Sequence, residues 1–192
     1  MKEKVRSRID ALRPLLKDPE PEVKIAAAEA IETLEKICSV EDILATLKTG
    51  NMGARIGAIY ALGEIGGERV FPALVYCARR SEADIRSAAA AVLGRLALPA
   101  ALPVLGELLD DEHPAVQGRA IAALRNFSVT PDILDKLRLF LSASDGVLEA
   151  EAAVTLAELR DLYSVSQIHA LLTSNHPATR VAAATALSRM PL

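Results

Sequence analysis

The 192-residue sequence contains no tryptophan, few other aromatic residues and only two cysteines. With 3% aromatic residues and little β-branched alternation, it does not favour a β-sandwich. Cys38 and Cys77 lie far apart and form no CxxC motif, so neither a disulfide framework nor a zinc knuckle is indicated. Alanine and leucine with scattered charged residues make up much of the chain instead, and this composition favours helices.

A strong charge of either sign and long apolar runs are also absent. The net charge of -3 produces no field that would attract nucleic acid or an anionic membrane. No apolar run approaches the ~20 residues of a membrane helix. The first residues, MKEKVRSRID, lack the apolar stretch of a signal peptide. We therefore expect a cytoplasmic protein that binds neither membranes nor nucleic acid.

An internal repeat organises the chain. Six positions, here called the marker column, recur at steps of 31, 31, 31, 32 and 31 residues: Lys24, Arg55, Arg86, Gln117, Glu149 and Arg180. Three residues after each marker stands the alanine column: Ala27, Ala58, Ala89, Ala120, Ala152 and Ala183. Seven residues after each marker stands the leucine column: Ile31, Leu62, Leu93, Leu124, Leu156 and Leu187. These offsets share one face of a helix, so each marker is expected on a helix that buries this face.

A second apolar pattern predicts another helix before each of these. Fifteen residues before the markers stand Ile9, Val40, Phe71, Leu102, Leu134 and Val165. Between the two helices lie short turns. There Pro21, Pro114 and Pro177 share the first helical position of the second helix, and Glu20, Asn51 and Asp145 are placed to cap it.

The expected fold is all-α: a right-handed α-solenoid of about six stacked antiparallel helix pairs, in one domain spanning residues 1–192. The expected repeats are approximately residues 5–37, 38–66, 67–97, 98–129, 130–161 and 162–192. In such a stack the second helix of each pair is pressed between its partner and both neighbouring repeats. A methyl-sized side chain permits that approach, which explains the alanine column.

The chain resembles HEAT repeats of the short bacterial kind, also called phycobilisome-lyase-like HEAT repeats. The resemblance rests on ALGEIGGERVFPALV, from Ala61 to Val75, and on LKDPEPEVKIAAAEAI, which is similar to the turn and second helix of that kind. It covers essentially the whole chain and specifies fold more strongly than activity, because the family includes scaffolds, lyase subunits and a few enzymes.

The resemblance also implies a ladder of turn aspartates, each six residues before a basic marker. Only Asp18 with Lys24 matches this pattern fully, and Asp111 precedes Gln117, so we expect little stability from the ladder.

No catalytic constellation emerges. His113 and His176 share one repeat offset before a proline, which is typical of solvent-facing turn residues rather than metal ligands. The His-Glu dipeptides of di-iron HEAT-repeat hydroxylases are absent, as are phosphate-binding glycine motifs. Cys77 occupies a position held elsewhere by leucine and is expected to fill the core. We expect no enzyme activity, metal or cofactor.

The remaining candidate is a surface formed by the second helices on the expected concave side. Positions one, five and eight residues after each marker are mostly small and apolar, with Tyr60 the large side chain among them. The predicted partner-binding residues are Tyr60 as anchor, flanked by Ile25 and Ile56, with Arg119, Arg125 and Glu151 setting orientation. The leading hypothesis is a non-catalytic scaffold that binds a protein or peptide.

Three alternatives stay open at this stage. The small residues of this surface could merely contact adjacent repeats. The family resemblance also allows a subunit of a bilin-chromophore lyase or a related protein-modifying enzyme. Finally, the chain could be part of a longer scaffold.

Overall fold

A computed structural model of the protein describes residues 2–191, apart from the side chains of Lys2 and Cys38. Every regular element in this range is helical, which confirms the all-α prediction. The chain divides into two compact units, one ending at Ile65 and the other beginning at Gly66, and each is described by itself. Whether the six repeats act as one domain stays a prediction.

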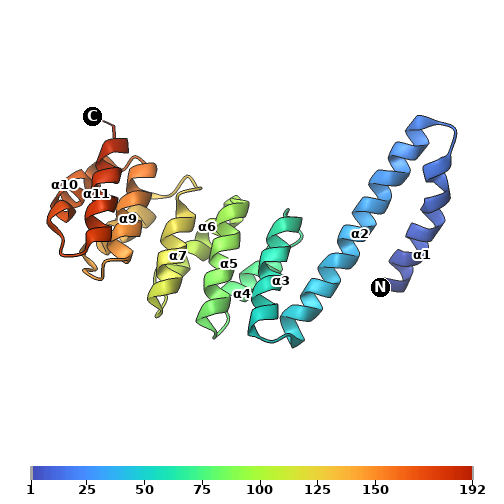
Figure 1. Ribbon diagram of the computed structural model, residues 1–192, viewed down its shortest axis with the longest axis horizontal. Coiled ribbons are helices and arrows are strands. Elements are labelled where there is room, and N and C mark those ends of the chain that lie inside the picture. Colours follow the sequence, from blue (N-terminus) through green and yellow to red (C-terminus); the bar gives the residue numbers. More distant parts are fainter. Residues whose placement is uncertain (1, 192) are drawn as a thin grey trace. The chain divides into compact units, whose positions relative to one another are not determined.

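Unit 1 consists of three α-helices and one short 3₁₀ turn. They are α1 (Lys2–Leu12), η1 (Arg13–Lys17), α2 (Pro21–Thr49) and α3 (Met52–Ile65). Helix α1 and the turn pack against α2, which also packs against α3 (Figure 1). The side chain of Asn51 begins α3, because its Oδ1 atom accepts the backbone N–H of Ala54 at 2.9 Å.

The boundary expected between residues 37 and 38 lies inside α2, which runs unbroken over 29 residues. After Pro21, this helix contains neither proline nor glycine, whereas each later junction carries at least one helix-breaking or turn residue. Helix α2 therefore serves as the second helix of the first repeat and the first helix of the next. None of the helices in residues 2–191 combines the length and apolar content needed to cross a bilayer, and this includes α2.

Unit 2 contains four stacked helix pairs. The first helices are α4 (Phe71–Ala78), α6 (Leu102–Leu108), α8 (Pro131–Leu139) and α10 (Val165–Ala170), and the second helices are α5 (Ala83–Leu96), α7 (Pro114–Leu124), α9 (Leu148–Glu158) and α11 (Pro177–Arg189). Short 3₁₀ turns η2 (Pro99–Ala101), η3 (Phe140–Ser142), η4 (Leu162–Ser164) and η5 (Leu171–Thr173) adjoin them. Helices α5, α7, α9 and α11 pack side by side in this order (Figure 1).

The predicted helix starts are largely confirmed. Pro21, Pro114 and Pro177 each occupy the first position of a helix. The Asp145 carboxylate accepts the N–H of Leu148 at 2.8 Å at the start of α9. The expected cap at Glu20 is wrong, because its side chain accepts no capping hydrogen bond.

The two apolar columns lie in the core as predicted. All six residues of the alanine column are buried, and four of them, Ala89, Ala120, Ala152 and Ala183, have no exposed surface. In the leucine column the middle members are fully buried, namely Leu62, Leu93, Leu124 and Leu156. The two end members, Ile31 and Leu187, are half-buried, as expected where a stack has a neighbour on one side only.

Candidate functional site

The second helices of unit 2 present a continuous row of small side chains. Positions one and five residues after each marker lie on the same helix face, and neighbouring helices place these faces side by side. We call this row the second-helix surface. It consists of half-exposed Ser87, Ala91, Gly118, Ala122, Ala150 and Val154. Its residues are short, so an approaching chain could reach the helix backbones closely.

Three of the six positions eight residues after the markers are not part of any exposed surface. Gly63, Gly94 and Ala157 are buried, so the expectation that they are exposed is wrong. A Cβ atom on Gly94 would lie 2.5 Å from Cβ and 2.8 Å from Cα of Ala123 on the next second helix. Gly94 therefore contacts the following repeat instead of solvent.

This contact predicts opposite effects for two glycine substitutions. For Gly94→Ala, helix propensity favours alanine by about 1 kcal/mol, but overpacking against the α7 backbone costs about 1–3 kcal/mol. We therefore expect a net loss of stability of about 1 kcal/mol. Gly118→Ala is the matched control, because its Cβ would meet only Leu148 Cδ2 at an ordinary 3.5 Å. Urea unfolding should show stabilisation there, and stabilisation of Gly94→Ala as well would contradict the close packing.

The predicted apolar binding residues lie in unit 1. Ile25 on α2 is 58% exposed and Tyr60 on α3 is 44% exposed, while Ile56 is half-buried one turn before Tyr60. Ile56 and Tyr60 are four residues apart on α3, so their side chains share a helix face. Their role in partner binding stays a prediction, but Ile25 and Tyr60 are accessible as it requires.

The predicted charged binding residues lie in unit 2, where two of them bind each other. Arg125 Nη2 contacts Glu151 Oε2 at 2.9 Å, and Arg125 Nε lies 3.7 Å from Glu158 Oε2. This cluster joins α7 to α9, and Arg125 is about a quarter exposed. Arg119 is exposed to solvent. Arg125 and Glu151 therefore link neighbouring repeats in addition to any contact with a partner.

A buried ion pair that the sequence interpretation missed joins α5 to the turn before α7. Arg86 donates two hydrogen bonds to the Asp111 carboxylate, from Nε to Oδ2 at 2.7 Å and from Nη2 to Oδ1 at 2.8 Å. The two side chains are 9% and 7% exposed. Arg86 Nη1 also donates to the carbonyls of Ser81 and Arg80 at 2.6 and 2.9 Å, so the guanidinium is held at both ends.

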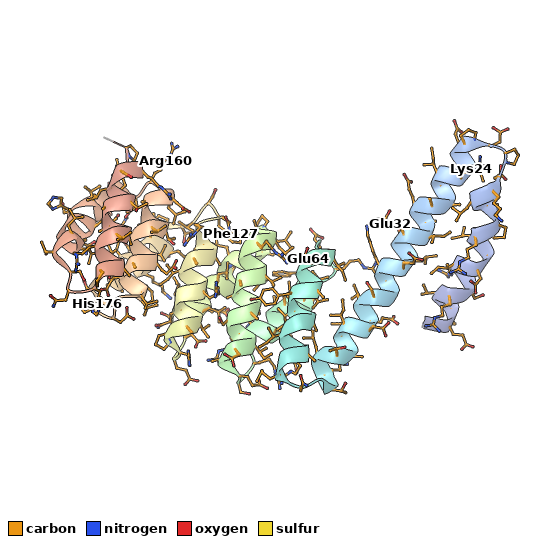
Figure 2. All side chains as sticks on the ribbon, in the orientation of Figure 1. Lys24, Glu32, Glu64, Phe127, Arg160 and His176 are labelled. Carbon is orange, nitrogen blue, oxygen red and sulfur yellow. The ribbon has the colours of Figure 1, made fainter. Side chains whose placement is uncertain are left out.

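This pair corrects the expected ladder. Asp111 is bound by the marker of the preceding repeat, Arg86, and not by Gln117 of its own repeat. Among the described residues no ion pair joins Asp18 to Lys24 either, and Lys24 is exposed at the first turn of α2 (Figure 2). The sequence did contain a signal for this pair, namely a basic marker in one repeat and an aspartate in the turn of the next. It was missed because the aspartates were compared only with the markers of their own repeats.

Hydrogen bonds fix the charge states of this pair. Burial alone raises the pKa of Asp111, but the hydrogen bonds from Arg86, the N–H of His113 and the charge of Arg86 together hold that pKa below its usual value. The hydrogen bonds with Asp111 raise the pKa of Arg86 further. Both groups are therefore ionised over the whole neutral range.

A different buried carboxylate joins α9 to α11. Glu149, a marker residue that is 1% exposed, accepts the Thr179 hydroxyl at Oε1 over 3.0 Å. Its Oε2 atom accepts the backbone N–H of Asp145 at 2.8 Å. Marker residues of either charge can thus bind a group in the following repeat.

The histidines and Cys77 show no arrangement for chemistry. His113 caps α7 by accepting the Ala115 N–H at Nδ1 over 3.3 Å. His176 precedes α11, and its ring is close to Gly146, where an added Cβ would lie 2.8 Å away (Figure 2). Cys77 is buried in the core, as expected. Within the described part of the chain, no three His, Cys, Asp or Glu residues are grouped to hold a metal ion.

Helix pairs stacked through columns of small residues define an α-solenoid, a class of repeat protein. Within that class the chain belongs to the HEAT-repeat family, whose pattern it matches over residues 9–94 and 71–148. This confirms the family interpretation of the sequence. No curated protein sequence matches the chain significantly.

Solved structures of similar fold include one natural complex and two engineered proteins. The complex of CpcE and CpcF of phycocyanin lyase from Nostoc sp. PCC7120 is similar with a TM-score of 0.64 and 22% identity, over 78% of this chain and 98% of that chain. One engineered protein has a TM-score of 0.57 and 22% identity, covering 95% and 96% of the two chains. Another has a TM-score of 0.58 and 21% identity, covering 94% and 97%. At these identities the likeness establishes the fold.

Proposed function

We propose that the protein is a non-catalytic scaffold that binds a protein or peptide partner through its second helices. The observation that carries the proposal is the exposure of Tyr60, at 44%, on a second helix of unit 1. A tyrosine with an accessible ring and hydroxyl supplies a large apolar contact and a hydrogen bond together. In unit 2, taken by itself, the second-helix surface offers short side chains that let an extended peptide or a helix approach closely.

The second helices of unit 2 also carry charged side chains that suit the polar rim of an interface. Arg119 is exposed on α7, and Glu151 is 42% exposed on α9 although it pairs with Arg125. Interfaces commonly combine an apolar centre with such partly exposed charges around it. The proposed compartment is the cytoplasm, and the proposed partner is a protein rather than a nucleic acid.

Tyr60→Ala tests the proposed anchor. A partner is first isolated by affinity purification from the source organism and then titrated against both proteins. Loss of a hot-spot anchor costs ~2 kcal/mol, so we expect binding to weaken about 30-fold. Equal affinity of the variant and the wild type would remove Tyr60 from the interface.

The control must carry the same change at another exposed tyrosine. Tyr163→Ala in η4 is suitable, because Tyr163 is 86% exposed and contacts the Arg138 guanidinium at the surface. We expect Tyr163→Ala to bind the partner as the wild type does.

A second candidate is a subunit of a bilin lyase, because the fold is similar to that of the phycocyanin lyase complex. The two candidates differ in one measurable property. A lyase subunit should change the visible absorbance of a bilin, or transfer it to a phycobiliprotein, when all components are mixed. Unchanged spectra of the bilin and the phycobiliprotein would favour the scaffold.

A further inference from the structure

The pair Arg86–Asp111 joins two consecutive repeats at the turn side of the stack. Three of its contacts are the two-pronged bond between the side chains, the bond from Arg86 Nη1 to the carbonyl of Arg80, and the bond from the His113 N–H to Asp111 Oδ1. The first contact links the two repeats. The other two orient the arginine and the aspartate within their own turns.

The last repeat carries the arginine half of the same arrangement. Arg180 is the marker of α11, and its Nη1 donates at 2.7 Å to the carbonyl of Ser174, six residues earlier. Arg86 Nη1 reaches the carbonyl six residues before it in the same way, at 2.9 Å. Arg180 is exposed, and no acidic side chain pairs with it among the described residues. Its orientation is that of Arg86 without the aspartate.

The first repeat carries the aspartate half. Asp18 Oδ1 accepts the N–H of Glu20 at 2.9 Å, as Asp111 Oδ1 accepts the N–H of His113 at 2.9 Å. Within residues 2–191 no basic side chain pairs with Asp18. The carboxylate is therefore oriented like that of Asp111 but lacks an arginine.

An apolar groove lies on the face of the first helix pair that a preceding repeat would cover. It has a volume of about 710 Å³ and lies between α1 and α2, where it is lined by Ala11, Leu12, Ala26, Ala30, Thr33 and Leu34 together with the charged residues Arg8 and Glu29. The positions equivalent to Ala30 in unit 2, Ala123 and Ala186, are 5% and 1% exposed. Those equivalent to Leu12 are fully buried, namely Leu105, Leu137 and Ile168. The first repeat thus leaves open a face that later repeats bury.

The opposite face is open on α11. Val181 is 66% exposed, and Ala184 and Ser188 are exposed too. The positions equivalent to Ala184 are buried in the preceding repeats, at Ala90, Ile121 and Ala153. The positions equivalent to Ser188 include Gly94, which contacts the next second helix directly. These residues have the size that an inter-repeat contact requires.

We propose that two copies of the chain associate head to tail, with α11 of one copy on the α1–α2 groove of the next. In this contact Arg180 of one copy binds Asp18 of the other, as Arg86 binds Asp111 within the chain. Opposite charges and small apolar surfaces meet in the same relative positions as between consecutive repeats. The contact is heterologous, so a pair of copies keeps one unused face of each kind, and further copies can add to form a ring or an open array.

Charge reversal tests this proposal. Sedimentation velocity of the whole chain over a range of concentrations should give a mass that rises beyond that of the dimer. Asp18→Arg and Arg180→Asp each bring like charges together, and each should weaken the association at least about tenfold. The double variant Asp18→Arg with Arg180→Asp restores opposite charges, so its association should return to within about threefold of the wild type.

Two control variants and one groove variant complete the experiment. Glu68→Arg and Arg69→Asp change charge by the same amounts at exposed positions before α4 and should associate like the wild type. Ala30→Glu places a charge in the groove and should abolish association, with circular dichroism confirming that each variant is folded. A wild type that is monomeric at every concentration would overturn the proposal. Single reversals that associate normally, or a double variant that does not recover, would overturn it too.

Discussion

Replacing Asp111 with alanine is expected to lower the free energy of unfolding by about 3–5 kcal/mol, because it leaves the buried guanidinium of Arg86 without its hydrogen-bonded counter-charge. The carboxylate of Glu112 lies 3.7 Å from Nη2, but it is 88% exposed and replaces Asp111 poorly. Arg86 is 9% exposed, so water reaches it poorly once the carboxylate is removed. The carbonyls of Arg80 and Ser81 would still accept hydrogen bonds from Nη1, but Nε and Nη2 would lose their hydrogen bonds to the Asp111 carboxylate. Urea unfolding monitored by circular dichroism measures the difference.

The adjacent residue provides the control for this variant. Asp110 is 67% exposed and pairs with Lys136 at the surface, so Asp110→Ala should change stability by less than about 1 kcal/mol. A loss of similar size in both variants would show that the Arg86–Asp111 pair is not the cause.

The same carboxylate makes stability depend on pH in a defined direction. Because the pKa of Asp111 in the folded protein is below its usual value, its contribution is fully present above the unfolded pKa of about 3.9. That contribution is lost as the pH falls through the folded pKa. Asp161, whose pKa is also lowered, acts in the same direction. The wild type should therefore lose more stability than Asp111→Ala when the pH is taken from neutral to about 3.

Ala89→Leu is expected to destabilise the protein by about 1–3 kcal/mol, since it adds three carbon atoms where no space exists. Ala89 has no exposed surface, and α5 packs against both α4 and α7. Ala91→Leu, at a half-exposed position two residues further along the same helix, is the control and should be nearly neutral. The midpoint of thermal unfolding compares the two variants, and a neutral Ala89→Leu would show that the alanine column does not set the spacing of the helices.

The fold was largely predictable from the sequence because every repeat carries the same pattern of apolar residues on its buried helix face. Six copies of an alanine and a leucine or isoleucine at fixed offsets identify a helix face, and the burial of the alanine column confirms it. The continuity of α2 was missed because the repeat period predicts where one repeat ends and the next begins, but does not show whether the chain turns at that boundary. The absence of proline and glycine inside α2 after its first residue was the available signal.

The candidate site was less predictable because its positions were assigned from one helix at a time. Opposite the alanine column a single helix appears exposed, yet Gly94 is covered by Ala123 of the following second helix and Ala157 is buried. Similarly, Arg125 and Glu151 were identified as separate charged residues, whereas they meet at 2.9 Å across α7 and α9. The exposure of Ile25 and Tyr60 agrees with the prediction, since their neighbours leave those faces open.

The unbroken helix α2 has a consequence for how the first part of the chain opens. In most repeat proteins each repeat can melt separately, and cooperativity comes from the interfaces between repeats. Here the backbone hydrogen bonds of one helix run without a break through both of the first two repeats. Unwinding that begins in one repeat therefore meets no turn at which it would stop before the other repeat. Amide protons along α2 should therefore exchange as a single cooperative unit, with protection extending across residues 37 and 38 instead of falling there.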